Sequence, residues 1–273
     1  MKDLEINTNR LEVIVKELDS AFKEGFGLLN DKNNLLENQI PKGVNQLSKK
    51  HACFMFFTAL NDHGTKSSIM YEKSKELFGS NPNLFEPIWI VENLSENDAV
   101  ELISKKIGAR YPQQLAKSWL KNAEILKEFY NSNPIEMFCS SNDATKLIAT
   151  LKSFRGVGTK IGGMILRAII GTGFNKNVFN IEKVLVPVDI HDSRIMFLTE
   201  SFVINNNEKV NYYKYVDIAQ TEILKACNRC NINWLDVDRA LWLTGSNGCV
   251  YDKCDICILN KYCIKGIKNG KKQ

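Results

Sequence analysis

Residues 151–170 read LKSFRGVGTKIGGMILRAII, and this stretch predicts two helices joined by a tight turn. We expect the first helix to end near Phe154, the turn to cover residues 156–158, and the second helix to begin at Thr159 or Lys160. Glycine in the turn lets the backbone approach a ligand closely. Backbone N–H groups at the start of a helix bind anions such as phosphate. The stretch therefore predicts a turn that holds a DNA backbone without reading its sequence. An ordinary turn between two helices is the alternative.

Lys160 falls in the first turn of the second predicted helix. The helix dipole disfavours a cation at this place. Burial and the positive helix end both favour the neutral amine, which is the form that attacks carbon. We interpret Lys160 as a candidate nucleophile, and a phosphate-contacting or solvated lysine is the alternative.

A short extended run over residues 184–188, broken by Pro187, leads to Asp189 and then to a predicted helix over residues 191–200. Asp189 can cap that helix and stay ionised. It can equally stabilise a developing positive charge or take a proton from a nucleophile. Both interpretations remain open at this point.

Four cysteines close the chain with the spacing C-x4-C-x2-C-x5-C, and they are Cys249, Cys254, Cys257 and Cys263. No signal peptide is visible, and clustered thiolates in a reducing compartment favour a metal over disulfides. The compact loop with uneven gaps suits an iron–sulfur cluster bound by four thiolates. The alternative is zinc held by the C-x2-C pairs at 227/230 and 254/257. It would leave Cys249 and Cys263 unused.

Helical patterns dominate the rest of the 273 residues, so the expected fold class is all-α. The net charge of +5 is compatible with nucleic-acid binding, and 44% hydrophobic residues suffice for a core. No run of eighteen apolar residues occurs, which predicts no membrane span. The clearest helical segments are 11–26, 99–106, 115–130, 144–154, 215–225 and 235–243.

The hairpin, the aspartate and the cysteines, in this order, resemble the helix-hairpin-helix (HhH-GPD) DNA glycosylases, and endonuclease III is the closest in layout. Residues 155–160 match the family hairpin with its catalytic lysine, and residues 188–191 resemble its aspartate segment. Residues 241–263 look like the end of endonuclease III, where a leucine-rich helix runs into a four-cysteine loop. The likeness extends from about Phe54 to Cys263.

The resemblance implies a bilobal, all-α glycosylase fold. A six-helix barrel lobe with the hairpin would cover residues 50–184. An iron–sulfur lobe would combine residues 185–273 with residues 1–49. A [4Fe-4S] cluster would be bound by the four cysteines. The first cysteine gap is shorter than in endonuclease III, and the segment before Phe54 is longer.

The resemblance also implies a base-excision-repair enzyme, a bifunctional DNA N-glycosylase and abasic-site lyase. A damaged base would be flipped out of the duplex, Lys160 would attack C1′, and the Schiff base would permit β-elimination. Asp189 would stabilise the transition state or assist deprotonation. The implied partner is double-stranded DNA with a damaged base or an abasic site, bound by a monomer in a prokaryotic cytoplasm. The implied DNA contacts are Arg155, Gly156, Val157, Gly158, Thr159 and His63.

The substrate is open between two classes of oxidised base. The four-cysteine loop favours an oxidised pyrimidine, whereas the hairpin and aspartate segments also resemble 8-oxoguanine glycosylases. Near residues 60–65 the family often has a glutamine that fills the gap left by the flipped base, and here His63 or Asn61 is the candidate substitute. A non-catalytic iron–sulfur or zinc module that only holds DNA is the third hypothesis.

Overall fold

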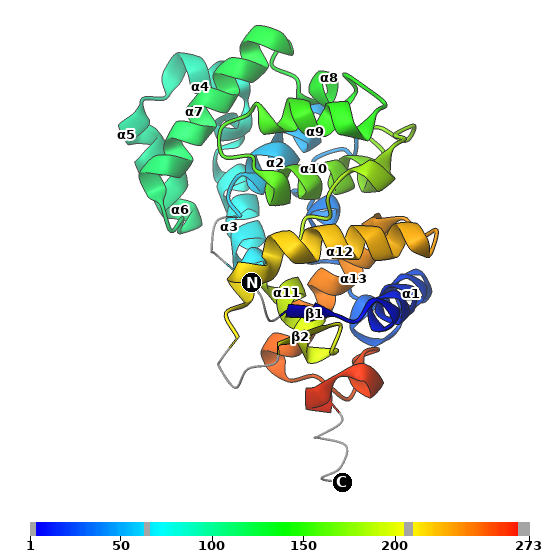
Figure 1. The fold of residues 1–273 in the computed structure, drawn as a ribbon. Helices are drawn as coiled ribbons and strands as arrows, with labels where there is room; N and C mark the ends of the chain where they lie inside the picture. The colour runs from blue at the N-terminus through cyan, green and yellow to red at the C-terminus, as the bar shows by residue number, and fades with distance from the viewer. Residues whose placement is uncertain (1–3, 63–65, 205–209, 267–273) are drawn as a thin grey trace. The chain divides into compact units, whose positions relative to one another are not determined.

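The computed structural model describes residues 4–62, 66–204 and 210–266, and the chain divides into two compact units (Figure 1). We call residues 33–180 the central unit, and residues 1–32 together with 181–273 the terminal unit. The resemblance implies boundaries after residue 49 and after residue 184. In the structure they fall after Lys32 and after Asn180.

The central unit is helical, and its core forms around the second helix of the chain. Phe54 and Phe57 lie on that helix, and every residue from His51 to Ala59 is buried. The rings of Phe57 and Trp119 lie 4.7 Å apart, and those of Phe85 and Trp119 lie 5.0 Å apart. The helices are α2 (Lys49–Ala59), α3 (Ser67–Ser80), α4 (Pro87–Asn93), α5 (Glu96–Ala99), α6 (Lys105–Ile107), α7 (Pro112–Phe129), α8 (Pro134–Phe138), α9 (Ala144–Lys152) and α10 (Thr159–Thr172).

Several local sequence features account for the helix ends in this unit. Ser95 and Asp98 form a capping box at the start of α5. A π-helical turn, Val100–Ser104, joins α5 to α6, and Gly108 ends α6 in the left-handed conformation. The side chain of Asp143 caps α9 by accepting a hydrogen bond from the backbone N–H of Thr145.

A buried ion pair explains why the segment after Lys32 belongs to the central unit. Glu37 lies in a 3-10 turn, Leu36–Asn38, and its carboxylate is 3.2 Å from the guanidinium of Arg167 on α10. The two side chains are 6% and 5% exposed. Two charges this deeply buried must pair, because each would be costly to bury alone. The pair therefore fixes the segment to α10.

The terminal unit packs its first helix against its last two. The buried face of α1 holds Leu11, Ile14, Leu18 and Phe22, and the helix ends at Gly25 in the left-handed conformation. The elements of this unit are β1 (Leu4–Ile6), α1 (Thr8–Glu24), α11 (Ile190–Leu198), β2 (Phe202–Ile204), α12 (Val216–Arg229) and α13 (Trp234–Leu243).

Two strands pair in the terminal unit, and neither lies where the sequence predicts one. β1 and β2 are antiparallel, with Leu4 opposite Ile204 and Ile6 opposite Phe202. The predicted extended run 184–188 joins no sheet. Its three valines and Pro187 are buried, while the N–H of Val188 bonds locally to the carbonyl of Val186. The run is thus buried without strand pairing. Across the described ranges, no helix is long and apolar enough to cross a membrane.

Candidate active site and cysteine site

The glycine turn of the central unit has the predicted form. Helix α9 ends at Lys152, and α10 begins at Thr159 with Gly158 at its cap. Gly156 has a φ of +83°, a conformation that a residue with a Cβ rarely adopts. The N–H of Val157 bonds to the carbonyl of Phe154 at 3.2 Å and closes the turn. The prediction of two helices joined by a tight glycine turn is therefore confirmed.

Asn122, a buried residue of α7, holds the turn from behind. Its side-chain amide donates to the carbonyl of Arg155 at 2.9 Å, and its side-chain oxygen accepts from the N–H of Arg155 at 2.8 Å. Sequence reasoning missed Asn122, because it lies 33 positions before the turn. The pair of hydrogen bonds fixes the backbone where the turn begins.

The outer face of the turn is open for a ligand. Arg155, Gly156 and Gly158 are exposed, and Thr159 is half-buried. A Cβ added at Gly158 would meet no atom within 4 Å. The first N–H groups of α10 have no partners within the helix, so this face can bind an anion. Val157 differs from its neighbours, because its side chain is buried and only its backbone could contact DNA.

Lys160 lies in the first turn of α10, and its amine is paired with a carboxylate. The Nζ atom is 2.9 Å from Oδ2 of Asp62. The lysine side chain is 34% exposed, whereas the aspartate side chain is 8% exposed. Sequence reasoning did not single out Asp62, although it lies within the segment 60–65 that was considered for the gap-filling residue. The structure therefore places a buried carboxylate, that of Asp62, beside the candidate nucleophile Lys160.

Asn61 and His63 are the two candidates for filling the gap that a flipped base leaves, and the structure describes only Asn61. Asn61 is buried, its amide donates to Oγ of Ser74 at 3.3 Å, and its oxygen accepts from Nε1 of Trp119 at 3.2 Å. Both ends of Asn61 are thus occupied in the core, and it does not substitute for a gap-filling glutamine. His63 lies outside the described residues.

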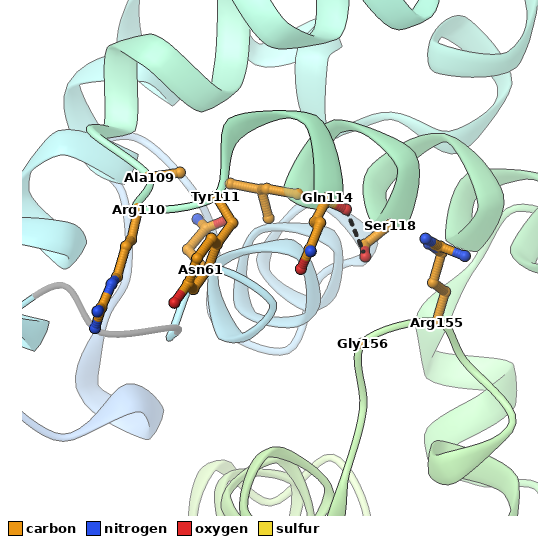
Figure 2. A pocket seen from close by; sticks show the side chains of 9 residues that line it. Asn61, Ala109, Arg110, Tyr111, Gln114, Ser118, Arg155 and Gly156 are labelled. Atoms are coloured by element: carbon orange, nitrogen blue, oxygen red, sulfur yellow. Dashed lines mark hydrogen bonds between the residues drawn. The ribbon is translucent and has the colours of Figure 1, made fainter.

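A cavity of about 330 Å³ opens beside the glycine turn. Figure 2 shows the side chains of Tyr111 and Gln114 between those of Arg110 and Arg155. The guanidinium of Arg110 is 5.4 Å from the centre of the Tyr111 ring. Tyr111 is half exposed, at 48%. Two cations and an aromatic ring beside a candidate phosphate-binding turn make a surface suited to a nucleotide.

In the terminal unit, Asp189 caps the start of α11, which agrees with its interpretation from sequence as a helix cap. Its Oδ1 atom accepts from the N–H of His191 at 2.7 Å and from that of Asp192 at 3.4 Å. The carboxylate of Asp192 accepts in return from the N–H of Asp189 at 2.8 Å, which completes a capping box. Asp192 therefore helps to hold Asp189 in place.

Helix α11 packs tightly against the turn before the cysteines. A Cβ on Gly245 would come within 2.8 Å of the Cβ of His191. The guanidinium of Arg194 donates to the carbonyl of Gly245 at 3.3 Å and lies 3.3 Å from Nδ1 of His191. The helix that carries Asp189 is thus fixed to the segment that leads into the cysteine loop.

The four predicted metal ligands, Cys249, Cys254, Cys257 and Cys263, line one cavity. Burial, with the other three cysteines adding to it, raises the pKa of the Cys257 thiol to about 12. Burial also raises the pKa of Cys249, and nearby Arg194 opposes this effect. Over residues 4–62, 66–204 and 210–266, no group of three or more His, Cys, Asp or Glu is arranged to hold a metal ion.

The other cysteine pair lies apart from this cavity, at the end of α12. Cys227 is buried, and Cys230 lies with its thiol 3.9 Å from the carbonyl of Glu12 on α1. The loop of four cysteines is itself attached to α1. The hydroxyl of Tyr262 donates to Glu17 at 2.8 Å, and Lys261 pairs with the same carboxylate at 3.0 Å.

Comparison with known proteins gives matches by structure. No protein-family model and no curated protein matches the sequence. A trapped covalent intermediate of endonuclease III with DNA, an estranged-adenine complex, is similar at a TM-score of 0.57 and 13% identity, over 97% of this chain and 99% of that one. An 8-oxoguanine DNA glycosylase of Thermotoga maritima is similar at a TM-score of 0.49 and 16% identity, over 85% and 95%. The chain therefore has the mainly helical fold of the helix-hairpin-helix DNA glycosylases, as its motifs predict.

Proposed function

We propose that this protein is a base-excision-repair DNA glycosylase that also cleaves the abasic site it creates. The observation that carries the proposal is the position of Lys160. It lies in the first turn of α10, directly after an exposed glycine turn, in a chain with the endonuclease III fold. A lysine at this place can bring its amine to a sugar whose phosphates are bound by the turn.

The chemistry assigned to Lys160 is nucleophilic. The neutral amine attacks C1′ of the damaged nucleotide, and the bond between C1′ and the base breaks with its electron pair leaving on the base. The sugar ring then opens to a Schiff base between C1′ and Nζ. Loss of a proton from C2′ expels the 3′ phosphate, and this elimination nicks the strand.

DNA would bind the central unit through the glycine turn and the adjacent cavity. The backbone of residues 156–159 would hold a phosphate, while Arg110 and Arg155 supply positive charge on either side of Tyr111. The partner is double-stranded DNA with a damaged base or an abasic site, bound by a single copy of the protein. His63 stays a proposed contact that the structure does not describe.

Asp189 would act on developing positive charge at the sugar. Its Oδ1 atom is occupied by the helix cap, so the carboxylate is held in a fixed direction. A fixed negative charge suits electrostatic stabilisation of an oxocarbenium-like transition state. We therefore assign Asp189 to charge stabilisation.

The four cysteines would hold a [4Fe-4S] cluster. The donor types fit this group, because four cysteines from one short loop line a single cavity, and cysteines lose their protons when they bind a metal. With every ligand position taken by a thiolate, the cluster would brace the loop against α1 and α11 and take no part in bond breaking. Zinc held by the C-x2-C pairs at 227/230 and 254/257 is the rival, and a bound cluster differs from zinc by absorbing near 400 nm.

We test the proposal by trapping with borohydride. The intact protein should form a covalent adduct with abasic duplex DNA, and Lys160→Ala should abolish it. Lys121→Ala is a matched control, because Lys121 is an exposed lysine of the same unit that pairs with Glu124. Binding of abasic DNA without an adduct from the intact protein would leave a non-catalytic DNA-binding module.

The base is identified by duplexes that each carry one lesion. We propose oxidised pyrimidines as the favoured substrates, because the cysteine loop resembles that of endonuclease III, with 8-oxoguanine as the alternative. Strand nicking at thymine glycol but not at 8-oxoguanine is the expected result, and the reverse pattern would select the alternative.

A further inference from the structure

We propose that Asp62 is the proton acceptor that converts Lys160 from an ammonium ion into a nucleophile. This inference rests on the proposed function of Lys160 and deepens it. The carboxylate Oδ2 of Asp62 lies 2.9 Å from Nζ of Lys160, within direct proton-transfer distance. No motif in the sequence assigns a role to Asp62.

The position of Asp62 is fixed by the core of the central unit. The N–H of Asp62 bonds to the carbonyl of Ala59, the last residue of α2, at 3.3 Å. The preceding residue, Asn61, is held by Ser74 and Trp119. The side chain of Asp62 is 8% exposed. A carboxylate that is held this firmly is placed for the amine before DNA arrives.

Asp62 shares its surroundings with three other titratable or charged groups. Asp62, Arg167 and Glu37 all act on the phenol of Tyr71. Arg167 and Glu37 pair with each other at 3.2 Å, so their charges offset. Burial raises the pKa of Tyr71, and Asp62 adds to this, so that phenol stays neutral. Within this set the charges of Arg167 and Glu37 offset each other, and the phenol of Tyr71 carries no charge.

DNA binding would shift the balance toward the neutral pair. In water an ammonium and a carboxylate are both well solvated, whereas a dry site penalises separated charge. The lysine side chain is 34% exposed without DNA. When DNA covers it, the remaining water leaves, and a neutral amine beside a neutral carboxylic acid becomes more accessible.

The step with an abasic site balances in atoms and charge. Asp62 takes one proton from the Lys160 ammonium, and the lone pair on Nζ forms a bond to C1′ of the aldehyde. The former aldehyde oxygen takes that proton back from Asp62 and a second one from Nζ, and it leaves as water. A protonated Schiff base and an ionised Asp62 remain.

Two roles for Asp62 predict opposite effects of Asp62→Asn. A carboxylate that only anchors the ammonium ion holds the lysine in its unreactive form, so its removal would speed adduct formation. A proton acceptor is needed for the reaction, so its removal would slow adduct formation. General acid–base catalysis commonly contributes about 10²–10⁴-fold, and we expect a loss of about 100-fold or more.

The experiment measures the single-turnover rate of borohydride trapping on abasic duplex DNA at pH 7. Glu92→Gln is the matched control, because Glu92 pairs with Lys127 at the same 2.9 Å on the exposed surface of this unit. Circular dichroism and binding of an uncleavable abasic analogue report folding and affinity. Trapping by Asp62→Asn at or above the rate of the intact protein would overturn the inference.

The pH dependence of the intact protein provides a second test that needs no folded variant. Transfer within the pair does not change its proton count, so we expect a rate that is nearly constant from about pH 6 to 8. Asp62→Asn, if folded, should instead gain about tenfold per pH unit, because its lysine must lose the proton to solvent. A tenfold gain per unit in the intact protein contradicts Asp62 as acceptor. No trapping by the intact protein at any pH would contradict the proposed function itself.

Discussion

The side-chain amide of Asn122 forms two hydrogen bonds to the backbone of Arg155, one through its nitrogen and one through its oxygen. Asn122 is fully buried, so truncation would leave two backbone groups without these partners. We expect Asn122→Ala to lower the free energy of unfolding by about 1–3 kcal/mol and to weaken binding of abasic DNA.

Asn93→Ala is the control for this prediction. Asn93 is an exposed asparagine that bonds to the backbone carbonyl of Trp89, so its loss should change stability by less than about 0.5 kcal/mol. Urea denaturation gives the stability, and fluorescence anisotropy with labelled duplex gives the affinity. Equal effects of the two variants would mean that Asn122 does not hold the turn.

The cavity beside the glycine turn gives a prediction about salt. If Arg110 and Arg155 contact phosphates, Arg110→Gln and Arg155→Gln should each weaken DNA binding and reduce the slope of log affinity against log salt by about 0.9. Lys121→Gln, on the exposed surface of α7, should leave the slope unchanged. Unaltered slopes in both arginine variants would place the DNA elsewhere.

The contact between Gly245 and His191 predicts a steric penalty. Gly245→Ala places a Cβ within 2.8 Å of the His191 Cβ, and overpacking of this kind costs about 1–3 kcal/mol. The helix that carries Asp189 should shift, so nicking should fall while adduct trapping at Lys160 falls less. Gly79→Ala adds the same methyl group in α3 where nothing lies within 4 Å. It should be neutral or slightly stabilising, and thermal unfolding compares the two.

The cysteine cavity predicts a bound chromophore. Purified protein should contain about four irons per chain and absorb near 400 nm, and Cys254→Ala should lose both. The thiols must lose protons to bind metal, so reconstitution should release acid that a pH indicator detects. Cys139→Ala removes an exposed cysteine of the central unit and should retain the chromophore. Stoichiometric zinc in the intact protein would contradict the cluster.

His51 predicts a loss of stability in acid. Burial lowers the pKa of His51, its Nδ1 accepts from the N–H of Leu47 at 3.2 Å, and its ring lies against Phe174. Below about pH 6.5 the unfolded chain binds a proton that the folded chain does not. The free energy of unfolding should therefore fall by up to about 1.4 kcal/mol per pH unit, down to the folded pKa. In His51→Asn the free energy of unfolding should change less steeply with pH between pH 7 and 5. Identical slopes in the two proteins would mean that His51 does not cause the loss of stability in acid.

Local signals made much of the fold predictable from the sequence. The side chains of Asp143 and Asp189 accept hydrogen bonds from N–H groups two or three positions further along the chain. Gly156 has a positive φ that the tight turn requires and that glycine adopts readily. Such features depend only on residues that are close together in the sequence, so the sequence predicts them. The order of the hairpin, the aspartate and the cysteines then indicated the glycosylase fold.

The residues that were missed depend on contacts between distant parts of the chain. Asp62 and Lys160 meet only because α2 and α10 pack in the same unit, and Asn122 meets Arg155 across 33 positions. The pairing of β1 with β2 joins residues 4–6 to residues 202–204, and no local pattern reveals it. The run 184–188 shows the opposite case, because it has the valines of a strand and is largely buried, but it pairs with no neighbouring strand.

Glu17 contacts Lys261 and Tyr262, which lie 244 and 245 positions later in the chain. The terminal unit thus closes only after the cysteine loop has left the ribosome, whereas residues 33–180 are one continuous segment. During synthesis the central unit can fold first, while α1 waits with its apolar face uncovered. Closure over such a span is slow. We expect α1 to be the part of the nascent chain most exposed to chaperones and proteases.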